Sequence, residues 1–202
     1  MAMRQQQEPL QSGSTMDYDE FIRALKYLLD AAWGSKWGIF SAEGPNVTDP
    51  RNVVFPHITH NIGSLQPGLI GKNTREIKPR HRYFEAPRDV NGTQPPARNI
   101  YGQVFETEMT FVIWEETNAQ ADKMAKKLRQ LLSTYTGYFK EKGLKELIFI
   151  KQENGGGGSG LQDMHKTRTL TYFVKFEELT EVPTDIIRIM NVVDEKLQKS
   201  SE

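Results

Sequence analysis

The chain contains no cysteine among its 202 residues. This absence excludes disulfides, cysteine-bound metal ions and a cysteine nucleophile. Residues 1–15 have no apolar stretch of the kind that a signal peptide needs, and no apolar run approaches the roughly 20 residues of a membrane-spanning helix. We therefore expect a protein that is made in a reducing cytoplasm and has no membrane among its partners.

The chain also lacks an excess of charge of either sign, because 26 lysines and arginines balance 26 acidic residues. Sequence-independent binding to nucleic acid strengthens with the number of phosphates that the protein neutralises, so overall neutrality argues against it. A net charge near zero does little to oppose self-association. The bulk composition is thus compatible with an oligomer.

Motifs that could carry chemistry are scarce as well. The glycine-rich residues 154–160 lack the Gly-Lys-Ser/Thr ending of a phosphate-binding loop and run into a strand pattern, so we interpret them as a hairpin tip. His57 and His60 point to opposite faces of a strand and cannot bind one metal ion, unless the strand breaks at Pro56. The sequence therefore predicts neither an enzyme nor a cofactor or metal site.

Two segments have the apolar spacing of amphipathic helices. Residues 17–32 begin with a capping box, carry one apolar stripe at three- and four-residue steps, and are followed by Gly34, which is expected to end the helix. Residues 117–135 repeat the pattern, with lysines and arginine on the opposite side, and Gly137 is expected to end this second helix.

Long strands dominate the second half of the chain. Residues 99–116 alternate with period two, which is typical of a strand with one face on a core. Residues 147–150 and 165–179 are also strand-like, and the glycine-rich loop between them predicts an antiparallel hairpin. We expect an α+β fold, with a mixed, mostly antiparallel sheet packed against two amphipathic helices and a long extended loop or hairpin excursion.

A shorter strand is expected earlier, over residues 52–60. Pro56 would lie inside it and cannot donate a ladder hydrogen bond, so this strand should sit at a sheet edge or carry a break. Trp33, Trp37 and Phe40 precede it, and we interpret them as a loop anchored to the core, because aromatic side chains most often serve burial.

The chain divides into a core and additions. We expect a disordered arm over residues 1–14, a single α+β domain over 15–182, and a C-terminal extension over 183–202. Within the domain, residues 61–98 lack periodicity and are interpreted as an extended loop or hairpin insertion that contacts a partner. In the extension, residues 186–193 fit a helix and a strand equally well.

One segment, residues 72–88, is basic. Six basic residues stand against Glu76 and Glu85, which gives the segment a net charge of +4. Such a segment can dock on an acidic protein surface, remain a solvated hairpin, or bind nucleic acid. We favour the first two, and the candidate partner-contact residues are Lys72, Arg75, Lys78, Arg80, Arg82, Tyr83, Phe84 and Arg88.

The order of these elements resembles that of the tail terminator (tail-completion) proteins of tailed bacteriophages. The resemblance lies in a capped helix, a short strand, a long loop, a long strand, a second helix and a strand hairpin. It covers most of the chain, through residues 17–32, 52–60, 99–116, 117–135, 147–150 and 165–179. The chain is longer than the simplest members, and residues 61–98 and the C-terminal segment look like additions.

The resemblance implies a virion structural protein, located in the tail or neck and assembled in the host cytoplasm. Its subunits would form a ring, usually a hexamer, that caps the tail tube and joins it to the head connector. Implied partners are further copies of the chain, the tail tube protein and the connector or stopper protein, with the tail sheath as a further candidate. DNA would pass through the lumen only transiently. The alternatives are another neck, tail or head-completion subunit, or a nucleic-acid-binding module that uses the basic segment 72–88.

Overall fold

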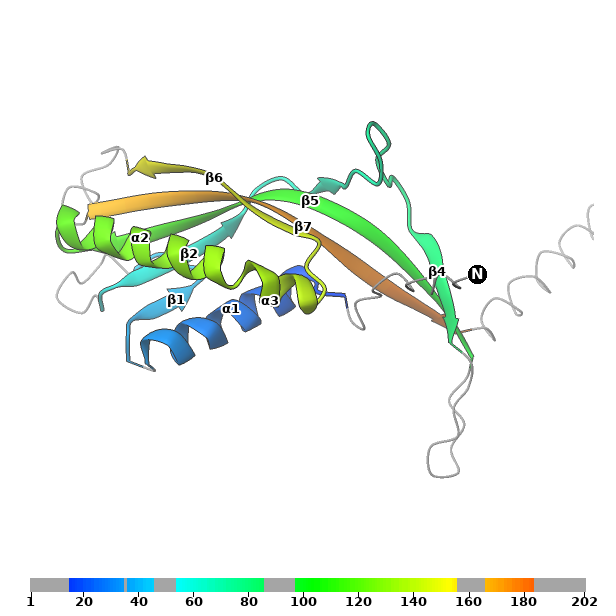
Figure 1. The fold of residues 1–202 in the computed structure, drawn as a ribbon, viewed down its shortest axis with the longest axis horizontal. Helices are drawn as coiled ribbons and strands as arrows, with labels where there is room; N and C mark the ends of the chain where they lie inside the picture. The colour runs from blue at the N-terminus through cyan, green and yellow to red at the C-terminus, as the bar shows by residue number, and fades with distance from the viewer. Residues whose placement is uncertain (1–14, 35, 46–53, 86–96, 156–165, 184–202) are drawn as a thin grey trace, which may run out of the picture.

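The computed structural model describes residues 15–34, 36–45, 54–85, 97–155 and 166–183. Over these ranges the fold is α+β, as expected, with a seven-stranded, mostly antiparallel sheet and three helices on one face of it (Figure 1). In chain order the elements are α1 (Tyr18–Trp33), β1 (Ile39–Ser41), β2 (His57–Ile62), β3 (Gln66–Pro67), β4 (Arg80–Glu85), β5 (Arg98–Glu115), α2 (Asn118–Thr134), α3 (Thr136–Glu141), β6 (Glu146–Asn154) and β7 (Lys166–Pro183).

Two expectations concern residues beyond these ranges. The N-terminal arm, residues 1–14, lies outside the described part of the chain, and so does the C-terminal extension after Pro183. The choice between helix and strand for residues 186–193 therefore stays open.

Strand β5 is the centre of the sheet. On one side it pairs with β7 over its whole length, and β6 pairs in turn with β7, which confirms the predicted hairpin. On the other side three short strands follow one another antiparallel to β5, with β2 opposite residues 109–114, β3 opposite 105–106 and β4 opposite 98–102. β1 extends β2 in parallel and makes the sheet mixed.

Much of the segment 61–98 is therefore part of the sheet. It contains the end of β2, all of β3 and all of β4, and β4 forms a hairpin with β5. Each of these pieces satisfies backbone groups along one edge of β5 that would otherwise lack hydrogen-bond partners. Residues 86–96 lie outside the described part.

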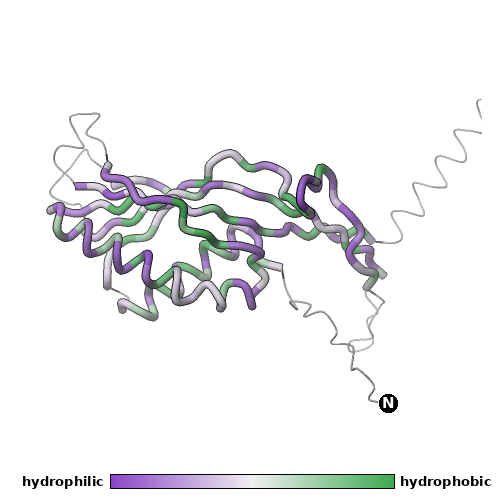
Figure 2. The backbone as a smooth tube through the Cα atoms, turned by 45° about the horizontal axis from the view of Figure 1, so that its top comes forward, coloured by the Kyte–Doolittle hydropathy of each residue, from purple (hydrophilic) through white to green (hydrophobic). Residues whose placement is uncertain are grey.

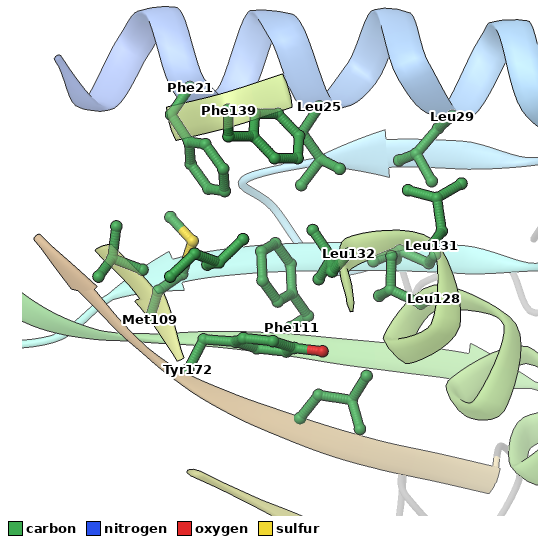
Figure 3. Packing of buried hydrophobic residues seen from close by; sticks show 14 of the residues in the cluster. Phe21, Leu25, Leu29, Met109, Phe111, Leu128, Leu131, Leu132, Phe139 and Tyr172 are labelled. Carbon is green, nitrogen blue, oxygen red and sulfur yellow. The ribbon is translucent and has the colours of Figure 1, made fainter. Parts of the chain in front are cut away.

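The hydrophobic core lies between the helices and one face of the sheet (Figure 3). Helix α1 contributes the fully buried side chains of Phe21, Leu25 and Leu29. Strand β5 contributes alternate residues that include Met109 and Phe111, as its period-two pattern predicted. The apolar stripe of α2 is buried against them, with Ala121, Ala125, Leu128, Leu131 and Leu132.

Both predicted helix starts are confirmed. Asp17 accepts a hydrogen bond from the Glu20 backbone nitrogen at 2.8 Å, and the Asp17 backbone nitrogen donates to the Glu20 carboxylate at 3.2 Å. The Thr117 hydroxyl accepts from the Gln120 backbone nitrogen at 3.3 Å. The end of α1 is confirmed at Gly34, whose φ of 86° suits glycine.

The expected helix end at Gly137 is wrong, because Gly137 lies inside the short helix α3. A glycine within a helix costs about 1 kcal/mol relative to alanine. Phe139 follows two residues later, is fully buried and packs edge-on against Phe21 with 5.1 Å between ring centroids. Burying such a side chain contributes roughly 1.5–3 kcal/mol, so packing outweighs the local preference.

The short strand begins later than expected. β2 starts at His57, directly after a cis peptide bond between Phe55 and Pro56, so Pro56 precedes the ladder instead of lying in it. Phe40 lies in β1 and not in a loop, opposite Ile58 of β2. The aromatic residues do anchor this region, as expected, because Trp33, Trp37 and Phe40 all pack against the core.

The two central strands reach far beyond the helices. β5 and β7 have 18 residues each, which at roughly 3.3 Å per residue is on the order of 60 Å. Helix α2 has 17 residues, which at roughly 1.5 Å per residue is about 26 Å. The protruding end, which we call the arm, consists of β4, residues 98–104 of β5 and residues 177–183 of β7 (Figure 1).

We expect Phe139→Ala to lower the free energy of unfolding by about 3–5 kcal/mol, because it opens a cavity between α3 and α1. Lys140→Ala, at an exposed position of the same helix, should change it by no more than about 0.5 kcal/mol. Urea unfolding followed by circular dichroism measures both values. Equal changes in the free energy of unfolding for the two variants would mean that burial of Phe139 does not stabilise α3.

Candidate assembly surface

The chain between β3 and β4 folds back onto the outer face of the sheet, which is the face opposite the helices. Met109 and Phe111 point to the helices, so the even-numbered residues of β5 point to the outer face. The Leu69 backbone nitrogen donates to Glu106 Oε1 at 2.7 Å, and the Gly68 backbone nitrogen donates to the Val104 carbonyl at 2.7 Å. These contacts hold the segment against β5.

Three glutamates are buried where this segment meets the sheet, and each is paired with cations. Glu106 lies opposite Lys175 in the strand register and contacts its Nζ at 3.3 Å and Arg75 Nη1 at 3.2 Å. Glu177 of β7 contacts Arg82 Nε at 2.5 Å and Lys145 Nζ at 2.7 Å. An unpaired carboxylate at such a depth would cost several kcal/mol, so these contacts are required for the segment to lie there.

The third glutamate, Glu76, fills a gap in the sheet. On the edge of β5 that carries β3 and β4, no strand is paired at Gln103 and Val104, which lie between the ends of these two strands. Glu76 Oε2 accepts a hydrogen bond from the Val104 backbone nitrogen at 2.8 Å, and the Glu76 carbonyl accepts one from Gln103 Nε2 at 2.8 Å. The Glu76 carboxylate therefore supplies the acceptor that a neighbouring strand would otherwise provide for the Val104 amide. It also contacts Arg82 Nη2 at 2.7 Å.

Gly102 makes room for this arrangement. The Arg82–Glu177 ion pair passes directly over Gly102, where a Cβ atom would lie 2.7 Å from both Arg82 Nε and Glu177 Oε1. A glycine inside a strand often marks such a close approach. Here it lets an arginine of β4 reach across β5 to a glutamate of β7.

The electrostatics of the buried glutamates follow from these partners. Burial by itself would raise the pKa of Glu76, but the Arg82 and Val104 hydrogen bonds and the charges of Arg82 and Arg80 hold it below its ordinary value of 4.5. The pKa of Glu106 is also below its ordinary value. Burial raises it, but the hydrogen bond from the Leu69 amide and the charges of Lys175 and Arg75 lower it by more. Both carboxylates are ionised at neutral pH.

The predicted contact residues fall into two groups. Arg75, Arg80 and Arg82 form ion pairs with the buried glutamates of the same chain, so much of their charge is compensated internally. Sequence reasoning missed this because Arg82 and Glu177 are 95 residues apart. Arg88 lies outside the described residues. The second group is exposed and forms no ion pair with the described residues, and it consists of Lys72, Lys78, Tyr83 and Phe84.

Hydrophobic and hydrophilic residues alternate along the arm (Figure 2), and several of its apolar side chains are exposed. Tyr83 and Phe84, on β4, are 51% and 53% exposed, and Leu179 of β7 is 36% exposed. Ile77, just before β4, is also exposed. Single apolar residues on a surface are ordinary, but a group of them on a protruding element is typical of a protein interaction site.

The arm also has an open strand edge. β6 pairs with β7 only as far as Lys175, whose carbonyl accepts the Lys145 backbone nitrogen at 2.9 Å. Because backbone groups alternate between the two sides of a strand, those of Glu177, Leu179 and Glu181 also point away from β5. Among the described residues no strand pairs with them. Such an edge can accept a strand from another chain.

One serine–histidine contact was not anticipated, since Ser41 Oγ lies 2.8 Å from His57 Nε2. The same nitrogen lies 3.1 Å from the Glu43 carbonyl, and the serine hydroxyl donates to that carbonyl at 2.6 Å. A carbonyl only accepts, so His57 Nε2 carries a proton and cannot take one from the serine. This pair does not have the geometry of an activated nucleophile.

The two histidines occupy different faces, as predicted. His60 lies on the helix side, with Nδ1 3.0 Å from the Tyr18 hydroxyl, whereas His57 contacts Ser41 and Glu43. In the described part of the chain no three histidine or carboxylate side chains gather as metal ligands would. None of the described helices combines the length and apolarity needed to cross a bilayer.

No protein-family model matches the chain, and no curated protein matches it in sequence.

We expect Glu76→Gln to lower the free energy of unfolding by roughly 3 kcal/mol, because it removes a buried charge and leaves Arg82 partly uncompensated. Glu153→Gln is the matched control, since the Lys151–Glu153 pair is about half exposed on both sides. It should change the value by less than about 1 kcal/mol. Similar losses in urea unfolding would show that burial of Glu76 does not matter.

A pH dependence follows from the same residues. Because the folded pKa values of Glu76 and Glu106 are depressed, their contribution to stability is fully present above about pH 4.5 and is lost as pH falls through the folded values. Urea unfolding between about pH 5 and pH 3 should therefore show a steeper loss for the wild type than for Glu76→Gln. Parallel profiles would contradict this assignment.

Proposed function

We propose that the chain is a structural subunit that assembles head to tail with copies of itself into a closed ring. The observation that carries the proposal is the arm, a three-stranded element with an open edge and exposed aromatic residues. A surface of this kind supplies backbone hydrogen bonds and apolar contacts to another protein. Overall neutrality of the chain does not oppose self-association.

The position of the open edges supports a head-to-tail contact. The outer edge of β7 lies on one side of the arm and the outer edge of β4 on the other, and within the described chain both pair only with β5 there. If β7 of one copy pairs with β4 of the next, each copy uses two different surfaces. Such a heterologous contact yields a ring when the rotation between neighbours closes.

The specific form of the proposal is a tail terminator of a tailed bacteriophage. It rests on the expected order of elements, to which the structure adds β1 and α3, and β3 and β4 in place of the expected long loop. In this role the ring caps the tail tube in the virion, and Tyr83 and Phe84 are candidate contacts to a neighbouring subunit or the tube. Six subunits, the connector or stopper, and a sheath as further partner follow from the resemblance alone.

The geometry favours this role over nucleic-acid binding by the basic segment. Arg75, Arg80 and Arg82 contact glutamates of their own chain, so fewer cations are available to neutralise phosphates. Another neck, tail or head-completion subunit remains the nearest alternative. Such a subunit would not stop the growth of a tail tube, whereas a terminator would.

We expect Leu179→Pro to abolish ring formation while leaving the subunit folded. The Leu179 amide points away from β5, so proline removes an edge donor without breaking the β5–β7 ladder. Leu179→Thr is the matched control, because it removes the apolar side chain and keeps the amide. Light scattering should give a monomer for the proline variant and a ring for the threonine variant, with matching circular dichroism spectra.

A proline variant that still forms rings of wild-type mass would exclude the β7 edge as the contact, and a monomeric wild type would exclude the ring itself. The tail-specific part is tested by adding purified rings to polymerising tail tubes of the phage that encodes the chain. Arrest of tube growth is expected. Unchanged growth would leave a ring that is not a terminator and would contradict this part.

A further inference from the structure

A groove of about 520 Å³ lies on the helix side of the sheet, away from the buried glutamates. It runs between the second half of α2 and strand β6, and it has one polar and one apolar wall. Arg129, Gln130 and Ser133 come from α2, Leu147 and Phe149 from β6, and Tyr172 from β7. Its volume lies in the range of small-molecule sites, roughly 300–1,000 Å³.

Tyr172 is an unusual residue for this place. It is only 3% exposed, and its hydroxyl has no hydrogen-bond partner among the described residues. Its ring is fixed by edge-on contacts with Phe111 and Phe149, at 5.8 and 5.4 Å between centroids. A buried hydroxyl without a partner costs about 1–3 kcal/mol, so phenylalanine would be the more stable choice unless the hydroxyl meets a ligand.

Arg129 lacks a counterion in the same groove. Its guanidinium lies 5.5 Å from the centroid of the Phe149 ring, and no carboxylate of the described chain lies within ion-pair distance of it. Burial raises the pKa of Tyr172, and the charge of Arg129 offsets part of this effect, so the two groups are electrostatically coupled. Two residues that line one groove therefore carry donors for which the described residues supply no acceptor, a guanidinium and a phenol hydroxyl.

We propose that this groove binds a carboxylate carried on a flat apolar body. Arg129 supplies a charge-assisted, planar contact that matches a carboxylate. The Tyr172 hydroxyl donates a second hydrogen bond, and Leu147 and Phe149 contact the apolar part. A single guanidinium balances the single negative charge of a carboxylate. The carboxylate comes either from a free acid or from an acidic side chain of a protein. Neither source requires the oligomeric ring of the proposed function.

The test uses the full chain with sodium benzoate as probe and benzamide as its uncharged counterpart. Saturation-transfer NMR reports on the ligand and works for weak binding and for any oligomeric state. Benzoate should bind and benzamide should not. Tyr172→Phe and Arg129→Gln should each weaken binding about tenfold or more, as expected for loss of a hydrogen bond to a charged group. Absence of benzoate binding, or equal binding of benzamide, would overturn the proposal.

Two controls separate the site from general effects. Lys126→Gln removes the same charge from an exposed position of α2 that does not line the groove, and it should leave binding unchanged. An equal loss in this variant would overturn the site, because long-range attraction alone would then explain binding. Tyr172→Phe should be at least as stable as the wild type, so its loss of binding cannot come from unfolding.

A second pair of probes identifies the source of the carboxylate. A capped Phe-Glu peptide is compared with its Phe-Gln counterpart in the same measurement. Binding of the glutamate peptide tighter than benzoate supports the site and assigns it to a protein side chain. If benzoate binds and the glutamate peptide does not, the result supports the site and assigns it to a free acid. Equal binding of the two peptides would contradict carboxylate recognition.

Discussion

The burial of Glu76 beside β5 is the interaction on which the shape of this protein depends. Its carboxylate accepts a hydrogen bond from the Val104 backbone nitrogen in the gap between β3 and β4. The same oxygen accepts a second hydrogen bond from Arg82 Nη2. Without an acceptor at this point, the Val104 amide would lack a hydrogen-bond partner in the gap between β3 and β4. With it, the gap at the start of the arm has an acceptor on one edge of β5, while on the other edge the ladder between β5 and β7 runs without interruption.

The same interaction determines what the arm presents to its surroundings. Because Arg82 contacts two glutamates of its own chain, the basic character of the segment is largely compensated. The side chains exposed at the arm include Tyr83, Phe84 and Leu179 alongside charged ones such as Arg80 and Glu181, next to backbone groups of β7 that point outward. This combination suits a contact with another folded protein better than a contact with phosphates, and the groove beside α2 adds a separate, polar site.

Periodicity predicted the regular part of the fold. The alternation in β5 and the stripes of α1 and α2 gave these elements nearly to the residue, because each pattern is local. Local signals misplaced β2 and ended the helical region at Gly137, since burial of Phe139 decided the outcome there. The glutamate network and the unpaired Tyr172 hydroxyl could not be predicted, because their neighbours are distant in sequence and no spacing rule links them.

The most direct test of the central claim is amide hydrogen exchange of residues 176–183, measured for the full chain over a series of protein concentrations. The even-numbered amides pair with β5 and should be protected throughout. If the outer edge of β7 is the contact between subunits, the amides of Glu177, Leu179 and Glu181 should become protected as concentration rises and the ring forms. Rapid exchange of these three amides at every concentration would contradict the account.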